Sequence, residues 1–451
     1  MNPRQARDTP DRMLRNRNKI KSDRMGRIVF RRINKAGMMD IFLRGLGRTE
    51  RRVGDWVTRE RMVVYSVAAL LVHATILGLW AWSSAGFTSN SSYRPGTDFS
   101  VFWVASHVML HGVPAQVYDY LAFGKLEQLL LSGYQHGGFL PWLYPPMFLL
   151  LVTPLGLLPF WLAFFTFVGA SVAIFVAGVL RVSGLGHALG KAKLARLVVA
   201  ASPCVFVCAT FGQNSLLTAA LAAFAVGWVE RKPVLAGICI GLLAAKPQMA
   251  LLFPLVLIAA QAWRVIAVAA VTAVLFTVLS LLVCGPQSLH LFLASADLAR
   301  DITLEHGYRF WLASPTPFAA FRLAAMDLTL AYIAQACVAL VAAAAACYVW
   351  QRTHETGSRA AVLAVATLIA NPYVWHYELA WLGIALACMA ATGLQRGWAR
   401  GEQTILVLAW ILPLYEFFNR VAEWPQVGPI ILLLMLLMIL QRVRTDTGSV
   451  Q

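Results

Sequence analysis

MVVYSVAALLVHATILGLWAW, residues 62–82, is an apolar run of about 20 residues, the length that a helix needs to cross the hydrocarbon core of a membrane. Comparable runs recur almost to the C-terminus, and 59% of the 451 residues are hydrophobic while only 13% are charged. Soluble globular proteins carry roughly 25% charged residues. The sequence therefore excludes a cytosolic globular enzyme and predicts an all-α, polytopic integral membrane protein.

A basic N-terminal tail carries most of the net charge of +17. Residues 1–61 hold 18 Lys and Arg residues against 7 Asp and Glu residues. Such a block before the first span predicts a cytoplasmic N-terminus that lies against anionic membrane lipids. Basic tails also bind nucleic acid, which we do not expect as a partner here. Because the tail lacks the apolar core and cleavage site of a signal peptide, we expect it to remain on the protein.

An outer loop, residues 83–141, follows the first span and is the expected place for chemistry. Apolar residues three and four positions apart within 97–138 predict two short amphipathic helices at the outer membrane surface, separated at Gly112-Val113-Pro114. The predicted transmembrane domain spans residues 62–441. A short cytoplasmic tail, residues 442–451, ends the chain.

Thirteen apolar segments are candidate membrane crossings. They are residues 62–82, 142–158, 159–181, 195–211, 213–229, 233–246, 247–262, 264–284, 317–350, 360–375, 377–394, 403–421 and 427–440. Arginine pairs place both ends of the domain inside, which requires an even number, so we predict about 12 transmembrane helices. Either the proline-rich segment 142–158 is re-entrant, or the stretch from Lys191 to Arg196 lies outside. The same rule places residues 285–316, 371–377 and 421–427 outside.

Asp98, in Gly96-Thr97-Asp98-Phe99-Ser100, is the candidate catalytic residue. A partly desolvated carboxyl group beside the membrane has a raised pKa, and it then accepts a proton from a hydroxyl group near neutral pH. The alternative is structural, because aspartate is a favoured N-cap at the start of a helix. The sequence leaves both interpretations open.

Polar residues between apolar segments are the first candidate substrate-binding residues. Tyr144 precedes Pro145-Pro146, which either shapes a groove or only fixes a change from extended chain to helix. Gln213 and Asn214 either bind sugar hydroxyls or phosphate, or they turn the chain and cap the next helix. Lys246, at the end of an apolar helix, either contacts phosphate or extends to the membrane interface.

The late stretch Asn371-Pro372-Tyr373-Val374-Trp375-His376-Tyr377-Glu378 supplies three more candidates. Aromatic residues alone form an interfacial belt, whereas a histidine and a glutamate are costly near hydrocarbon unless they serve each other or a ligand. We therefore expect Trp375, His376 and Glu378 to bind substrate. Arg322, within an apolar stretch, either neutralises a phosphate or pairs with Asp327.

Motifs for metal and nucleotide chemistry are missing from the sequence, which has no GxxxxGK[ST], no HExxH and no Asp-x-Asp. We expect no metal, no cofactor and no use of nucleotide sugars. The seven cysteines lie in or beside apolar segments without CxxC spacing and are expected to act as small hydrophobic residues. The mixed charges of residues 285–316 are typical of a solvated face.

Taken in order, these motifs resemble glycosyltransferase family 87, a group of GT-C membrane glycosyltransferases. The resemblance spans roughly residues 62–440. It rests on Asp98, Phe102-Trp103, Gly112, Tyr118, Tyr144-Pro145-Pro146, Gly212-Gln213-Asn214, Gly237 through Lys246-Pro247, Asn371-Pro372 and Trp375-His376. Some relatives begin the late motif with Ser-Pro and have paired histidines, where this chain has Asn371-Pro372 and His376-Tyr377.

The family resemblance implies a multi-pass enzyme of the plasma (inner) membrane. Its reaction is the inverting, metal-independent transfer of a hexose, typically mannose, from a polyprenyl-phosphate-linked donor to a lipid or glycan acceptor on the outer face. Asp98 matches the general base and His376 matches a ligand of sugar or phosphate. A prenyl donor needs a lateral groove, which broken helices provide, and a cation such as Lys246, Arg309 or Arg322 offsets charge on the departing phosphate.

Two other classes of protein use some of the same features. A transporter or lipid flippase has polar breaks in its spans, but the sequence shows neither the internal repeat of such proteins nor a use for an acid in the outer loop. A non-catalytic scaffold needs Asp98 only as a helix cap. Substituting Asp98→Asn separates these classes, because only a glycosyltransferase loses turnover.

Overall fold

The computed structural model describes residues 55–84, 86, 94–131 and 140–448, so the expectations for the basic tail lie almost entirely outside the described residues. The described chain is helical and contains no strand. Its first helices are α3 (Arg59–Ser83), α4 (Thr97–His111), η1 (Pro114–Tyr118), α5 (Tyr120–Leu130), α6 (Pro146–Val152), η2 (Thr153–Leu157), α7 (Phe160–Ser183), α8 (Leu185–Ala188), α9 (Ala192–Ala200), α10 (Pro203–Phe211) and α11 (Ser215–Trp228).

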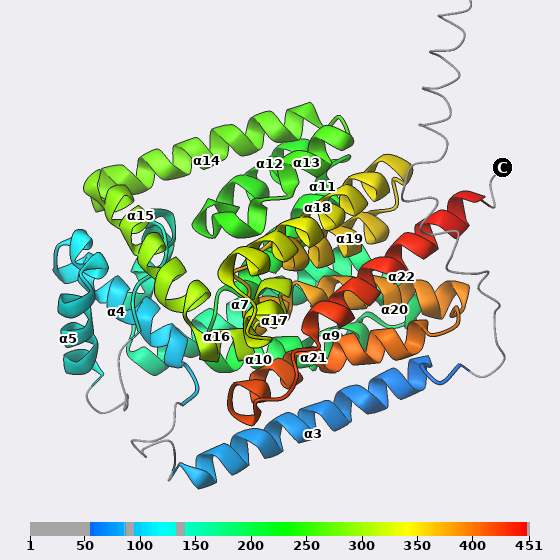
Figure 1. The fold of residues 1–451 in the computed structure, drawn as a ribbon, viewed down its shortest axis with the longest axis horizontal. Coiled ribbons are helices and arrows are strands. Elements are labelled where there is room, and N and C mark those ends of the chain that lie inside the picture. The colour runs from blue at the N-terminus through cyan, green and yellow to red at the C-terminus, as the bar shows by residue number, and fades with distance from the viewer. Residues whose placement is uncertain (1–54, 85, 87–93, 132–139, 449–451) are drawn as a thin grey trace, which may run out of the picture. The chain divides into compact units, whose positions relative to one another are not determined.

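The second half of the chain continues in the same way (Figure 1). Its elements are α12 (Pro233–Leu242), η3 (Leu243–Ala245), η4 (Pro247–Ala250), α13 (Phe253–Ala259), α14 (Trp263–Cys284), α15 (Gln287–Ala299), the π-helix η5 (Arg300–Glu305), α16 (Tyr308–Leu312), α17 (Pro317–Leu323), α18 (Leu328–Arg352), α19 (Thr356–Ala370), η6 (His376–Ala380), α20 (Leu382–Arg396), α21 (Glu402–Ala422) and α22 (Gly428–Gly448).

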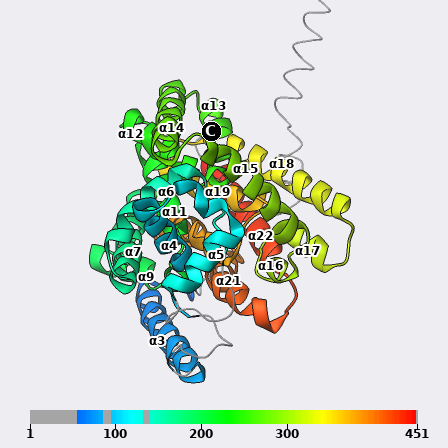
Figure 2. The same ribbon diagram turned by 90° about the vertical axis from the view of Figure 1, so that its left-hand side faces the viewer.

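The helices differ sharply in how much of their surface the protein covers. In α3 and α14, which lie on opposite sides of the bundle in both views, only 17% of the apolar window is buried (Figures 1 and 2). In the segment that contains α20 the share is 83%. Helices α11 and α19 are likewise built from small residues that are mostly buried. An apolar outer surface around a core of small residues is what a multi-pass membrane protein requires.

Seven described helices are long and apolar enough to cross a membrane, or eight if the bent pair α9 and α10 is one span. The predicted number of about 12 crossings is not confirmed. Five further apolar segments form helices of only 10–17 residues. At 1.5 Å per residue each covers less than the roughly 30 Å of a hydrocarbon core. The expected single segment 317–350 is also divided, because Asp327 caps a new helix at Leu328.

Both ends of the transmembrane part meet on one side of the bundle. The side-chain oxygen Oε1 of Gln403 accepts hydrogen bonds from the backbone N–H groups of Trp56 and Val57, at 2.8 and 2.7 Å. Near the other end of the chain, Arg442 pairs with Glu402. The even number of crossings that the charge pattern requires and the cytoplasmic assignment of that side both stay predictions.

The outer loop does contain two short helices, α4 and α5, at one end of the bundle beside α6 and α15 (Figure 2). The expectation that both lie on the membrane surface is wrong for α4, because ten of its fifteen residues are buried, on all sides of the helix. The short helices α6 and η2 and the long helix α7 pack against it. Helix α5 does expose apolar side chains, including Leu121 and Leu129. The start of α4 is therefore held inside the protein.

Glycines let α12 approach α14 closely. A Cβ atom on Gly237 would lie 2.6 Å from Cβ of Val268, and one on Gly241 would lie 2.4 Å from Cβ of Thr272. Spacing of four residues puts both glycines on one face, the small-residue contact common between membrane helices. Since Lys246 follows α12 after a single 3-10 turn, this contact also sets where the lysine stands.

We expect Gly241→Val to lower the free energy of unfolding by about 1–3 kcal/mol, because the added side chain forces α12 away from α14. The midpoint of thermal unfolding in detergent measures this effect. Gly169→Val is the matched control, since a Cβ atom on Gly169 of α7 meets nothing within 4 Å. Equal midpoints for the two variants would contradict the close contact.

Candidate active site

Asp98 is the second residue of α4 and is not its N-cap. That position belongs to Gly96, in the left-handed region at φ 80°, whose N–H donates to the carbonyl oxygen of Thr210 at 2.7 Å. The alternative interpretation of Asp98 as a helix cap is therefore wrong. The Asp98 side chain instead accepts a hydrogen bond at Oδ2 from Nε2 of Gln213, at 2.7 Å.

The carboxyl group of Asp98 is buried, with 8% of the residue exposed. Burial raises its pKa to about 6, although the hydrogen bond from Gln213 and the positive charges of Arg420 and Lys246 act in the opposite direction. Glu378 adds a smaller upward shift through its negative charge. A carboxyl group with this pKa is ionised at neutral pH and is basic enough to take a proton from a hydroxyl group.

Gln213 holds the carboxylate in place. Its Oε1 accepts a hydrogen bond from the hydroxyl group of Tyr144 at 2.9 Å, so both ends of the amide are bonded within the protein. Burial raises the pKa of Tyr144 well above its ordinary value, which keeps the phenol protonated as the donor. The turn at Gly212 is equally constrained, since φ is 70° and a Cβ atom there would lie 2.6 Å from Cβ of Phe99.

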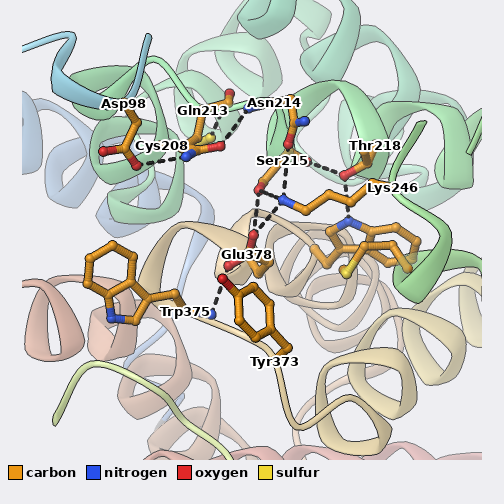
Figure 3. A network of polar contacts seen from close by, with 12 residues as sticks. Asp98, Cys208, Gln213, Asn214, Ser215, Thr218, Lys246, Tyr373, Trp375 and Glu378 are labelled. Atoms are coloured by element: carbon orange, nitrogen blue, oxygen red, sulfur yellow. Dashed lines mark hydrogen bonds and ion pairs between the residues drawn. The ribbon is translucent and has the colours of Figure 1, made fainter. Parts of the chain in front are cut away.

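Lys246 forms a buried ion pair with Glu378, at 2.6 Å from Nζ to Oε1 (Figure 3). Its ammonium group also donates to Oδ1 of Asn214 at 3.0 Å and to Oγ of Ser215 at 3.3 Å. With 4% of the residue exposed, Lys246 does not extend to the membrane interface as one interpretation held. Asn214 occupies the N-cap position of α11 but makes no side-chain cap, because its oxygen binds the lysine.

The second oxygen of Glu378 fixes the late motif. Oε2 accepts the backbone N–H of Trp375 at 2.8 Å, so the ion pair ties residues 371–378 to the segments that carry Asn214 and Lys246. The sequence left open whether Glu378 pairs with His376 or with a ligand. In the structure it pairs with Lys246, a residue of another segment. The late motif, Gln213-Asn214 and Lys246 thus form one polar network with Asp98 at its edge (Figure 3).

Several buried polar atoms around this network have no hydrogen-bond partner in the described part of the chain. They are Nδ2 of Asn214, Nε1 of Trp375, and Nδ1 and Nε2 of His376. His376 is fully buried, with its ring against Phe211, Trp375 and Phe417. Leaving such groups unpaired costs about 1–3 kcal/mol each, so their presence together points to a polar ligand that pairs with them.

The sequence predictions chose the wrong arginine for the polar network. Arg322 is not part of the network: its guanidinium donates to the carbonyl oxygens of Met326 and Glu305 and lies over the ring of Trp311. Its proposed partner Asp327 instead caps α18. Arg420 of α21, which the sequence analysis missed, acts electrostatically on Asp98. The signal was present in Glu416, Asn419 and Arg420, which interrupt an otherwise apolar span.

A cluster with metal-binding geometry lies elsewhere in the described chain. Asp301, Glu305 and His306 present ligand atoms within 4.8 Å of one another, in the segment predicted to be a solvated face. Glu305 is already engaged by Arg300 and by the hydroxyl group of Tyr332. This cluster belongs to η5 and the residue after it, and it takes no part in the network around Asp98. All seven cysteines are free.

Comparison with known proteins gives one match. The model of glycosyltransferase family 87 matches residues 142–372, more than half of the chain. No curated protein and no solved structure matches the chain. The matched residues include Tyr144, Gln213, Asn214 and Lys246, while Asp98 precedes them and Glu378 follows. With its apolar helices and the family match over this core, the chain belongs to glycosyltransferase family 87 and is a membrane glycosyltransferase.

Proposed function

We propose that the protein transfers a hexose, with mannose as the expected sugar, from a polyprenyl-phosphate-linked donor to a lipid or glycan acceptor on the outer face of the plasma membrane. The reaction is metal-independent and inverts the anomeric centre, with Asp98 as the general base. One observation carries this proposal: a buried carboxylate with a raised pKa stands at the edge of a network surrounded by unpaired buried polar atoms.

The chemistry follows from this arrangement. The acceptor oxygen attacks the anomeric carbon, its proton passes to Asp98, and the bond from that carbon to the phosphate oxygen breaks with its electron pair on the phosphate. Attack from the face opposite the leaving group inverts the centre. Asn214, Trp375 and His376 pair with sugar or phosphate oxygens, since these atoms otherwise stay unsatisfied.

Four predicted substrate-binding residues take positioning roles instead. Gln213 and Tyr144 orient the carboxylate of Asp98, and Lys246 with Glu378 holds the late motif against α11. The ion pair is internally neutral, so it does not bring net positive charge to a phosphate. In these assignments the hydrogen bonds and the ion pair within the protein stay in place, and the unpaired atoms bind the ligand.

Transfer of radiolabelled mannose from polyprenyl-phosphate-mannose to a membrane lipid extract, with and without EDTA, tests the proposal. We expect the purified protein to transfer label equally in both conditions. Loss of transfer on chelation would contradict the metal-independent mechanism. Movement of the labelled donor across vesicle membranes without transfer would support the transporter or lipid flippase interpretation instead.

Activity should depend on pH through Asp98. We expect kcat/KM to fall as the pH drops through about 6, because protonation removes the base. Gln213→Leu removes a hydrogen bond that stabilises the carboxylate, so the acidic limb of the pH profile should move to higher pH. A profile for this variant that matches the wild type would show that Gln213 does not act on the base.

A further inference from the structure

Glu127 of α5 is a buried carboxyl group that the proposed reaction does not use. Only 1% of the residue is exposed. It lies between Leu126 and Leu130, two positions away from Phe123 and Leu131 on the same helix, and these apolar side chains pack in the cluster that encloses α4. Burying a carboxyl group among apolar residues is costly unless hydrogen bonds compensate. The groups that bind Glu127 therefore indicate its role.

The first oxygen of Glu127 contacts the helix that carries Asp98. Its Oε1 accepts a hydrogen bond from Oγ of Ser100, at 3.3 Å. Ser100 follows Asp98 by two residues, and the same hydroxyl group also donates to the carbonyl oxygen of Thr97, at 2.6 Å. The contact thus joins α5 to the first turn of α4, the turn that holds the carboxylate of Asp98.

The second oxygen of Glu127 binds the segment that leads to Tyr144. Its Oε2 accepts the backbone N–H of Leu140, at 3.0 Å. Four residues later, the hydroxyl group of Tyr144 donates to Oε1 of Gln213 at 2.9 Å. The Nε2 atom of Gln213 in turn donates to Asp98 at 2.7 Å. A second connection therefore runs from Glu127 through the chain to the same carboxylate.

We propose that Glu127 is a positioning residue for the general base. Through its two oxygens it fixes the first turn of α4 relative to Tyr144, so that Gln213 holds the carboxylate of Asp98 in place. This inference rests on the proposed function. A base must lie within hydrogen-bond distance of the proton that it takes, and a displacement of about 1 Å can cost about 100-fold in rate.

Glu127→Leu tests the proposal, because leucine fills a similar volume but accepts no hydrogen bond. We expect kcat to fall about 10- to 100-fold. The dissociation constant of polyprenyl-phosphate-mannose, titrated without acceptor, should not change. Glu127→Gln should restore most of kcat, since its amide oxygen accepts from Leu140 and its amide N–H donates to the hydroxyl group of Ser100. Loss of donor affinity equal to the loss of kcat would contradict a role through the base.

The same substitution in the Asp98→Asn background separates positioning of the base from a general structural role. If Glu127 acts through Asp98, adding Glu127→Leu should not lower the residual transfer rate further, because the base is already absent. A general structural loss would lower the rate by the same factor in both backgrounds. Labelled mannose transfer by the four proteins gives this comparison.

Gln403→Leu is the matched control. Gln403 also anchors a segment through backbone N–H groups, those of Trp56 and Val57, but it takes no part in the network around Asp98. We expect this variant to lower the midpoint of thermal unfolding and to keep the wild-type kcat. If Glu127→Leu does not fold, Ser100→Ala removes only the contact with α4, and it should lower kcat in the wild-type background but not in Asp98→Asn.

Wild-type kcat for Glu127→Leu would overturn the proposal, as would equal losses in the two backgrounds. Failure of the wild-type protein to transfer sugar would instead overturn the proposed function. The two failures are distinguishable because the first is measured against a wild-type protein that transfers sugar.

Discussion

Asp98→Asn should reduce sugar transfer at least about 100-fold and up to about 10,000-fold, the contribution of a positioned general base. The amide has the size and polarity of the carboxyl group but cannot accept the proton of the acceptor hydroxyl. Donor binding should persist, because the atoms assigned to the sugar and the phosphate belong to other residues. Steady-state transfer of labelled mannose gives the loss of kcat, and titration with the donor gives its dissociation constant.

Asp119→Asn is the matched control for this substitution. Asp119 lies in the same outer loop, is exposed, and caps α5 by accepting from the backbone N–H groups of Leu121 and Ala122. Asparagine is an equally good cap, so we expect wild-type transfer. Equal transfer by Asp98→Asn and wild type would remove Asp98 as the general base.

Breaking the buried ion pair should have the largest effect on stability. We expect Lys246→Met to cost about 3–5 kcal/mol, because it leaves the charge of Glu378 buried without its partner. The rate of sugar transfer should fall as well, since Glu378 then no longer positions Trp375 through the hydrogen bond from its backbone N–H. The shift of the thermal unfolding midpoint in detergent, with bound prenyl ligand absent, measures the loss.

The double variant Lys246→Met with Glu378→Gln tests whether the two residues stabilise the fold as a coupled ion pair or contribute separately to the free energy of unfolding. Removing both charges should recover much of the stability that the single change loses, since no unpaired charge remains. Arg396→Gln provides the exposed counterpart: its pair with Glu355 is 3.2 Å long but 45% and 37% exposed, so the loss should stay within about 1 kcal/mol. Additive single losses would contradict a strongly coupled pair.

Local sequence was enough for the class of protein, and it indicated several residues that the structure brings into one polar network. Hydropathy is a property of consecutive residues, so the apolar runs indicated the membrane helices without any knowledge of their packing. The polar interruptions at Gln213-Asn214, Lys246 and Glu378 were visible because lipid tolerates such residues only with partners. The family resemblance rests in part on Gln213-Asn214 and Lys246, and the family is confirmed.

Local sequence did not give the number of crossings. Helices α11 and α19 are apolar but too short to cross a membrane. Their hydropathy does not distinguish them from helices that do cross it. Their burial among other helices decides that they form the core, and burial depends on neighbours far away along the chain. For the same reason α4 was expected at the membrane surface although the bundle encloses it.

The sequence by itself determined that this chain is a helical membrane protein with an acid in the loop after its first span and polar residues at the breaks between helices. Only the tertiary structure decided that Arg420, rather than Arg322, acts electrostatically on Asp98. It also decided which polar residues meet: Lys246 with Glu378, and Gln213 with Asp98. The physical reason is that an ion pair or hydrogen bond acts over a few ångströms. Sequence separations of 132 and 115 residues carry no information about which pairs come that close.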